Sequence, residues 1–340
     1  VIVNAVYGVV MAAIKVLEQE SPDAFIACWD LEGPTFRHEA FTAYKAQRET
    51  KEDELYAQIP MIQEGLSCLG VPSYTAEGFE ADDVIGTLAA RAEREGWTVS
   101  ILTGDRDLLQ LITKNIEVRL FRKGISETEL VTVDTMEGLF GLTPGQMVEY
   151  KMLRGDASDN IPGVSGIGDK GAKELIAMYG AVDAMMRAAH DTTSSMPNRY
   201  RKALLAGEHE LAGLRSLVTI RCDVPLEIEL VPLSMDRHAE SFLSFLREYG
   251  FKTLLPRAEG TPRASKKNAA EPPARTTNAD NPIMKLAPVV EEAHTVHAVQ
   301  QWVAAHEGRL ALCFTPSGGM VPPELWVCAS GQQVLRVMAE

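Results

Sequence analysis

Two aspartates set three residues apart are the residues of this sequence best suited to chemistry. Asp156 and Asp159 lie within GDASDN at residues 155–160. Two carboxylates at this spacing on one helical turn can face the same point. A glycine-punctuated turn over residues 162–168 follows and leads into an apolar helix beginning at Asp169. Because a helix start offers N–H groups and a positive dipole end to a phosphate, the sequence predicts a metal-type acidic pair beside a phosphate clamp.

Two glycines and two lysines shape the expected clamp. Gly166 and Gly168 permit a tight hairpin and a close approach of the backbone to a ligand. Lys170 and Lys173 lie just inside the following helix and add positive charge without sequence preference. We expect these four residues to bind a nucleic-acid backbone, and an ordinary loop with a capped helix is the alternative.

Three more aspartates follow apolar runs that are typical of buried strands. Residues 25–29 end at Asp30, and residues 97–103 are followed by Asp105 and Asp107. Open α/β sheets place their ligands at the carboxyl ends of such strands. We therefore expect these carboxylates at one edge of one sheet, although a solvated loop residue is the simpler interpretation of Asp30 alone.

The start of an expected helix within residues 78–88 carries Glu80, Asp82 and Asp83. Acidic residues in a first helical turn oppose the helix dipole, which would account for one or two of them. Three carboxylates within four positions repel one another, and a hard cation with oxygen ligands would compensate their charge. Helix capping and metal binding both remain open for this motif.

Convergence of all these acids would require cations. Oxygen-ligated Mg²⁺ or Mn²⁺ suits such a cluster, and two ions about 3.5–4 Å apart can activate a water and stabilise the leaving oxygen in phosphodiester hydrolysis. No Ser/His/Asp or Cys/His arrangement competes with this chemistry. The expected ligands are Asp30, Glu80, Asp82, Asp83, Asp105, Asp107, Asp156 and Asp159.

Residues 34–52 interleave basic and aromatic side chains. Such a pattern can hold phosphates and stack on splayed bases, although a charged surface helix accounts for the pattern alone. The side chains concerned are Phe36, Arg37, Phe41, Tyr44, Lys45, Arg48 and Lys51.

The elements that must position these residues alternate between helices and strands. Apolar spacing predicts helices over residues 5–17 and 54–69 and strands over 25–29, 97–103 and 117–121. Residues 181–250 are expected to be mostly helical, with an extended piece at 217–220. The pattern indicates an α/β fold.

Composition indicates a globular chain. The 340 residues are 46% apolar, which suffices for two or three domains. The net charge of −14 argues against a nucleic-acid partner unless the acids are concentrated at a metal site. The five cysteines show no metal spacing. Because no signal peptide or long apolar run is present, we expect a soluble cytoplasmic protein. We also expect a monomer.

The stretch GDASDN followed by the Gly-Ile-Gly hairpin resembles the helix-three-turn-helix of the flap-endonuclease/5′-nuclease family, specifically the version in bacterial DNA polymerase I. The resemblance extends over about residues 1–258, including the arch motif FRHEAFTAYKAQR and the closing phrase LREYGFKTLL. It implies a PIN-like, mostly parallel sheet flanked by helices, with a helix-hairpin-helix type DNA-binding subdomain. It also implies cleavage of 5′ ends and 5′ flaps of branched DNA in replication and repair.

The resemblance assigns roles to particular residues. The eight acids would hold two Mg²⁺ or Mn²⁺ ions, with Lys45 and Arg48 catalytic. Arg37, Tyr44, Gly166, Gly168, Lys170 and Lys173 would contact DNA, and a monovalent cation would bind at the 163–168 hairpin. The match departs from the family at Gly171, where Thr is usual, and the family's first strand, which carries an early Asp, has no counterpart here.

The resemblance also divides the chain. Residues 1–150 would form the PIN-like core with the arch, and residues 151–258 the helix-three-turn-helix and closing segment. A change of composition predicts a flexible linker over 259–283. Residues 284–340 resemble the start of a truncated 3′-5′ exonuclease-like domain without its metal ligands, and a polymerase domain is expected in the full-length parent.

Two other functions remain as alternatives. A catalytically impaired DNA-binding fragment would use the hairpin and the arch without cleavage, because the first strand and its Asp are missing. A small-RNA nuclease of the related PIN type would share the acidic core, but that type lacks the arch and the helix-three-turn-helix. Metal-dependent cleavage of flapped DNA separates both alternatives from the nuclease.

Overall fold

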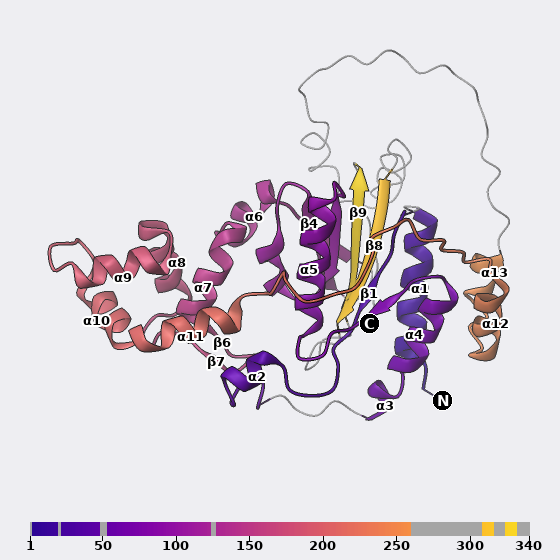
Figure 1. Ribbon diagram of the computed structural model, residues 1–340, viewed down its shortest axis with the longest axis horizontal. Helices are drawn as coiled ribbons and strands as arrows, with labels where there is room; N and C mark the ends of the chain where they lie inside the picture. Colours follow the sequence, from indigo (N-terminus) through magenta and orange to yellow (C-terminus); the bar gives the residue numbers. More distant parts are fainter. Residues whose placement is uncertain are drawn as a thin grey trace, which may run out of the picture.

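The computed structural model describes residues 2–19, 22–47, 53–123, 127–259, 308–315 and 324–331. A central group of strands lies between two helical regions, and the molecule is elongated (Figure 1). The acidic residues of interest lie where the strands meet the larger helical region.

The first four strands pair in parallel, which agrees with the mostly parallel core that the resemblance implies. Strand β1 (Ala27–Cys28) pairs parallel with β2 (Ser73–Tyr74). Strand β3 (Val99–Thr103) pairs parallel with β4 (Ile116–Lys123), and β4 pairs antiparallel with β5 (Glu127–Val131). Successive residues from 24 to 29 alternate between two separate apolar clusters, as side chains of a strand buried on both faces must.

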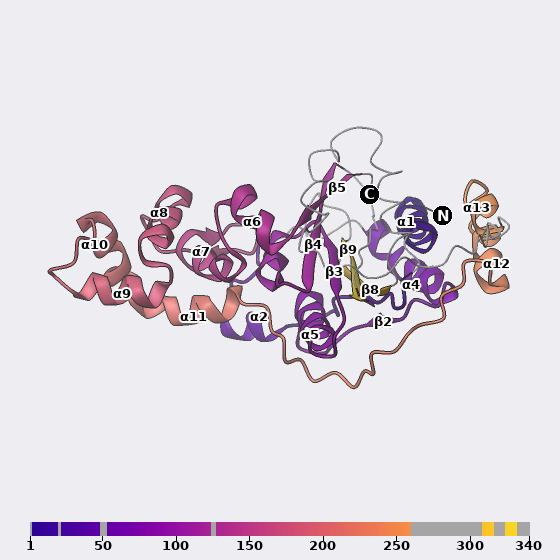
Figure 2. The ribbon, with the colours of Figure 1, turned by 90° about the horizontal axis from the view of Figure 1, so that it is seen from above.

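Helices cover both faces of the strands (Figure 2). Helix α5 (Ala81–Arg94) packs in the same apolar cluster as Val99 and Ile101 of β3, whereas Leu102 belongs to the cluster of α1 (Asn4–Gln19) and α4 (Ile59–Cys68). One helix was expected over 54–69, but the structure has α3 (Asp53–Tyr56) and α4 separately. Pro60 lies in the first turn of α4, where its missing N–H costs nothing.

The helical region on the other side of the strands carries the motif that organises the sequence. It follows a 3₁₀ helix, η1 (Arg106–Leu111), and comprises α6 (Val133–Phe140), η2 (Pro144–Gln146), α7 (Met147–Arg154), α8 (Asp169–Tyr179), α9 (Val182–His190), α10 (Asn198–Ala206) and α11 (Glu208–Val218). Between α7 and α8, β6 (Gly155–Asp156) and β7 (Ile161–Pro162) form a short antiparallel hairpin. Asp156 and Asp159 therefore lie in a hairpin, and the expectation of a helical turn was wrong.

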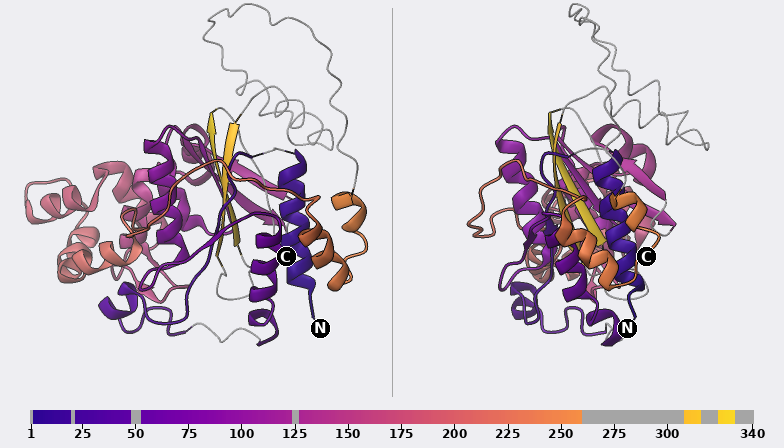
Figure 3. Two further views of the ribbon diagram at one scale, coloured as in Figure 1. Left: turned by 45° about the vertical axis from the view of Figure 1, so that its right-hand side comes forward. Right: turned by 90° about the vertical axis from the view of Figure 1, so that its right-hand side faces the viewer.

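Residues 219–239 cross from this region back to α4, where α12 (Glu240–Glu248) and α13 (Leu255–Glu259) pack (Figure 3). Backbone bonds from Leu233 N–H to Asp23 O (2.7 Å) and from Asp236 N–H to Leu69 O (3.1 Å) hold this segment in place. The extended piece expected at 217–220 begins only after α11 ends at Val218.

Strands β8 (Gly308–Thr315) and β9 (Glu324–Gly331) pair antiparallel and lie beside β1 and β3 (Figure 1). These two strands belong to the segment 284–340, which was expected to begin a separate exonuclease-like domain, and they lie against strands of the core instead. Residues 260–307, and with them nearly all of the expected linker, lie outside the described residues. Among the described residues, no helix has the length and apolar character needed to span a membrane.

Candidate metal centre and nucleic-acid interface

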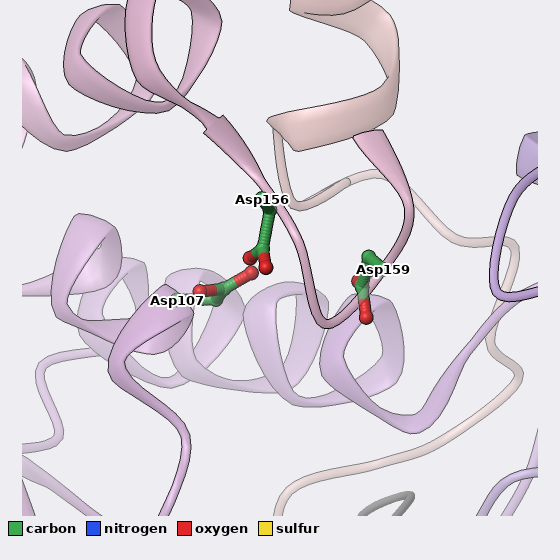
Figure 4. A group of neighbouring side chains, drawn as sticks. All are labelled: Asp107, Asp156 and Asp159. Atoms are coloured by element: carbon green, nitrogen blue, oxygen red, sulfur yellow. The ribbon is translucent and has the colours of Figure 1, made fainter. Parts of the chain in front are cut away.

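Three aspartates from two segments form a compact cluster. Asp107 comes from η1, directly after β3, while Asp156 and Asp159 come from the β6–β7 hairpin. One carboxylate oxygen from each residue lies within 4.8 Å of the others. The carboxylates of Asp107 and Asp156 point toward one another, with Asp159 beside them (Figure 4). The donors are all oxygen, the set that hard divalent cations prefer.

Close backbone packing positions the hairpin that carries two of these acids. Gly155 has φ +76°, and a Cβ there would lie 2.3 Å from Gly163 N. A Cβ on Gly163 would lie 2.2 Å from the carbonyl carbon of Arg154. Both positions therefore require glycine, because the atoms in the way are backbone. On the other segment, Asp105 caps η1 by accepting from Asp107 N–H at 2.7 Å.

A lysine that was given no role in the sequence analysis lies inside the cluster. Lys151 of α7 is 8% exposed, and its ammonium forms ion pairs with Asp107 and, at 2.5 Å, with Asp156. Burial and the nearby charge of Asp105 raise the pKa of Asp107 to about 8, although Lys151 acts in the opposite direction. Burial alone would raise the pKa of Asp156, but Lys151 and Ser158 outweigh it and hold that pKa below its ordinary range.

A second acidic group lies deeper and is neutralised by Arg37. The guanidinium of Arg37 donates to both carboxylate oxygens of Asp83 at 2.7 and 2.8 Å and to Glu80 at 3.1 Å. It also donates to the carbonyls of Leu217 (2.8 Å) and Thr219 (2.9 Å). Arg37 is 3% exposed and Asp83 is fully buried. The expectation that Arg37 lies at the surface to contact phosphate is corrected here, since its donors already serve buried acceptors.

Tyr44 connects the two acidic groups. Its hydroxyl lies 2.9 Å from Glu80 Oε2 and 3.1 Å from Asp159 Oδ2. Burial, together with the charges of Glu80 and Asp159, raises the pKa of Tyr44, so the hydroxyl stays protonated as a donor. Tyr44 is only 3% exposed, and its ring face is therefore not available to stack on a base as the pattern had suggested.

The base of the expected arch is anchored to the same hairpin. Helix α2 (Phe36–Ala40) is short, and turns follow it to residue 47. Lys45 Nζ donates to Glu80 Oε1 at 2.6 Å, and Lys45 N–H donates to the carbonyl of Asp159 at 2.9 Å. Burial alone would raise the pKa of Glu80, but Lys45 and Arg37 outweigh it and lower that pKa.

Backbone strain accompanies this anchor. Lys45 (φ 54°) and Asn160 (φ 56°) are the non-glycine residues with positive φ among those described. Asn tolerates this conformation better than Lys, and such strain persists where surrounding contacts enforce it. Asn160 Nδ2 donates to the carbonyl of Ala43 at 2.6 Å, and Gln47 donates to Asn160 Oδ1 at 2.7 Å.

The remaining sequence-derived ligands have varied surroundings. Asp30 is exposed and accepts from Ala81 N–H at 2.7 Å, so it caps α5. Asp82 and Asp105 are partly exposed. Asp30, Glu80, Asp82, Asp83 and Asp105 do not belong to the three-aspartate cluster found among the described residues. Arg48, expected to be catalytic, lies outside the described residues.

The expected phosphate clamp is a turn followed by a helix start. Gly166 has φ +87°, and Gly168 is the N-cap of α8. Lys170 is exposed, whereas Lys173 lies partly over the Tyr150 ring and 3.8 Å from Asp169. A pocket of about 410 Å³ lies here, lined by Gly166, Gly168, Asp169, Lys170, Gly171, Glu174, Arg199 and Tyr200. A Cβ on Gly171 would lie 3.1 Å from the Tyr200 ring, so glycine leaves space for that ring.

Two features of the site were missed by the sequence analysis. Lys151 lies within an amphipathic helix, where a lysine usually indicates a solvated face. The pairing of Arg37 with Asp83 joins residues 46 positions apart, and no local pattern indicates it. For Lys151 the available signal was its position four residues before GDASDN.

Comparisons with known proteins agree with this architecture. Residues 1–141 match the family model of the 5′-3′ exonuclease N-terminal resolvase-like domain, and residues 142–241 match the 5′-3′ exonuclease C-terminal SAM fold. A solved structure of a T5 5′-exonuclease with bound divalent metal ions (zinc) is similar at a TM-score of 0.54 and 23% identity. That match covers 63% of this chain and 81% of the T5 protein, and it bears on the fold.

Curated relatives are similar in sequence as well. DNA polymerase I of Bacillus caldotenax is 38% identical over 270 residues, which are 79% of this chain and 30% of that protein. DNA polymerase I of Bacillus subtilis is 36% identical over 255 residues, or 75% of this chain and 29% of that protein. This chain thus spans about three tenths of the length of these relatives. Since the two family models together cover residues 1–241, the chain belongs to the 5′-3′ exonuclease family and corresponds to the exonuclease region of DNA polymerase I.

Proposed function

We propose that this chain is a metal-dependent 5′ nuclease that hydrolyses phosphodiesters at 5′ ends and 5′ flaps of branched DNA. The observation that carries the proposal is the meeting of Asp107, Asp156 and Asp159 within 4.8 Å. They meet on a fold whose family is that of 5′-3′ exonucleases. The substrate is inferred from the relatives, which are DNA polymerases I.

The donor set favours Mg²⁺ or Mn²⁺ as the cofactor, because all of its ligand atoms are carboxylate oxygens. Asp107, Asp156 and Asp159 would hold a cation directly. Asp30, Asp82 and Asp105 would complete a second position, with Glu80 and Asp83 supporting it from the buried group. Bound divalent cations supply Lewis-acid activation of a water and neutralise developing charge.

The protein's own cations would act on the substrate. Lys45 holds its ammonium 2.6 Å from Glu80 at the edge of the acidic region, with 18% of its side chain exposed. We assign to it a contact with the scissile phosphate, and to Arg48 a second contact from the arch. Arg37 and Tyr44 instead orient Glu80, Asp83 and Asp159 from below.

The clamp after the hairpin would hold the duplex backbone. Exposed Lys170 and the N–H groups at the start of α8 line an open pocket, and both favour phosphate without reading sequence. Gly166, Gly168 and Lys173 complete this surface, and a monovalent cation at residues 163–168 would support it. We further propose that the protein acts as a monomer, and that its parent carries a polymerase domain.

The test is cleavage of a 5′-flap duplex with Mg²⁺, comparing the unsubstituted chain with Asp107→Asn. Loss of a cation ligand is expected to lower the cleavage rate by about 100-fold or more. EDTA should abolish cleavage of both proteins. Asp134→Asn is the matched control, since Asp134 is an exposed acid on α6 that does not belong to the cluster, and its rate should be unchanged.

Binding should be measured in the same samples by fluorescence anisotropy of the labelled flap. Retained binding without Mg²⁺-dependent cleavage by the unsubstituted chain would contradict the nuclease and support a DNA-binding fragment. Faster cleavage of single-stranded RNA than of the flap would contradict the assigned substrate.

A further inference from the structure

The position of Lys151 is unusual for a site that is built to bind cations. Its ammonium lies between Asp107 and Asp156, at 2.5 Å from the latter, and only 8% of the residue is exposed. These are two of the three carboxylates that lie within 4.8 Å of one another. The protein therefore places a positive charge of its own where the proposed cofactor would bind.

The Lys151 ammonium and a divalent cation cannot both bind the same carboxylate oxygens of Asp107 and Asp156 at the same time. Lysine has three donors and no acceptor, so it cannot be a metal ligand. Mg²⁺ approaches its oxygens to about 2.0–2.1 Å, and an ammonium within hydrogen-bond distance of the same oxygens would repel it. Asp156 has little spare capacity, since its other oxygen accepts from Ser158 N–H at 2.9 Å and from the Ser158 hydroxyl at 2.5 Å.

We propose that Lys151 is a tethered counter-ion that exchanges with the divalent cation. In the metal-free protein it holds Asp107 and Asp156 together, and it must leave them before one cation can bind both. Lys151 is thus a positioning residue that sets the metal affinity, an inference that rests on the proposed function of the same cluster.

The direction in which metal affinity changes when Lys151 is replaced separates this role from a purely structural one. If Lys151 only supported the fold, replacing it would loosen the cluster and weaken metal binding. If it competes with the cation, replacing it with a neutral side chain strengthens metal binding, while the metal-free protein becomes less stable because Asp107 and Asp156 lose the ion-pair partner that they share.

The experiment is a calorimetric titration of the chelator-treated full chain with Mn²⁺ alone, with the melting temperature followed in parallel. Lys151→Met is expected to bind Mn²⁺ about 10-fold more tightly and to melt at a lower temperature without metal. Lys151→Arg keeps the charge and should not gain affinity. Lys202→Met, which removes an exposed lysine on α10, is the matched control and should behave like the unsubstituted chain.

If Lys151→Met does not fold, Lys151→Gln gives the same test, because its side chain is also neutral and its amide carries N–H donors. Unchanged or weaker Mn²⁺ binding by a folded neutral variant would overturn the exchange and leave the nuclease assignment standing. Absence of Mn²⁺ binding by every protein, with the unsubstituted chain inactive on the flap, would overturn both.

Discussion

At the scale of single residues, the most consequential side chain outside the three-aspartate cluster is Arg37. Its partners are the Asp83 carboxylate, Glu80, the carbonyl of Leu217 in the last turn of α11, and the carbonyl of Thr219, which follows that helix. Burial lowers its pKa, but the hydrogen bonds and charges of Asp83 and Glu80 outweigh this and raise it. Arg37 therefore stays charged, and it is needed because Asp83 is fully buried.

Replacing Arg37 with Met should unfold the protein more easily, because it leaves the Asp83 charge buried without its partner. We expect a loss of about 3–5 kcal/mol in the free energy of unfolding, measured by urea denaturation. Arg199→Met is the matched control, since 70% of the Arg199 side chain is exposed at its pair with Glu174, and it should cost at most about 1 kcal/mol. A loss below that of the control would show that Arg37 is not the anchor described here.

At the scale of elements, the β6–β7 hairpin determines where two of the three clustered acids lie. Its strands approach so closely that Gly155 and Gly163 face each other without room for a Cβ on either. The hairpin is also joined to α7 through Val164 N–H, which donates to Leu153 O at 2.8 Å. The positions of Asp156 and Asp159 thus depend on the close packing of the backbone around the hairpin, as well as on their own side chains.

Gly163→Ala should therefore disturb both the fold and the cation site. The added methyl meets the Arg154 carbonyl group, and overpacking of this kind costs about 1–3 kcal/mol. We expect that loss in urea denaturation, together with weaker Mn²⁺ binding in calorimetry. Gly138→Ala, in an open position of α6, should instead gain about 0.5–1 kcal/mol. Equal stability of the two variants would contradict the close approach.

Prediction from sequence succeeded for elements whose signal is local. The apolar run 97–103 indicated β3 and the acids that follow it, and residues 162–169 indicated the turn before α8. It failed where distant segments decide the outcome. The spacing of Asp156 and Asp159 suited a helix as well as a hairpin, and the close packing of Gly155 against Gly163 is possible in the hairpin because neither residue has a Cβ. Tyr44 and Arg37 were expected at the surface because their buried partners lie far along the chain.

At the scale of the whole molecule, the described residues form two apolar clusters on opposite sides of the strands. One of them includes α12, which lies mostly beyond the residues matched by the family models. The ring of Phe245 fills the space beside Gly65, where a Cβ would lie 2.7 Å from it. The packing of α1 and α4 therefore depends on α12, which lies about 180 residues after α4 along the chain.

Phe245→Ala should destabilise the whole fold rather than its end alone. Removing a buried aromatic ring leaves a cavity and costs about 3–5 kcal/mol, which a single urea transition followed by circular dichroism would report. Met178→Ala removes a large apolar side chain that is 50% exposed and should change stability by at most about 0.5 kcal/mol. Separate transitions for the two sides of the sheet would contradict a single cooperative unit.

The bonds between the arch base and the acidic hairpin have a consequence for how such proteins diverge. The Asn160 amide donates to the carbonyl of Ala43 and accepts from Gln47, and Lys45 N–H donates to the carbonyl of Asp159. The side chains that are acceptable at residues 43–47 thus depend on the turn at 159–160, although more than a hundred positions separate the two segments along the chain. An arch exchanged with that of another protein would therefore keep these bonds only if the turn at 159–160 were exchanged with it.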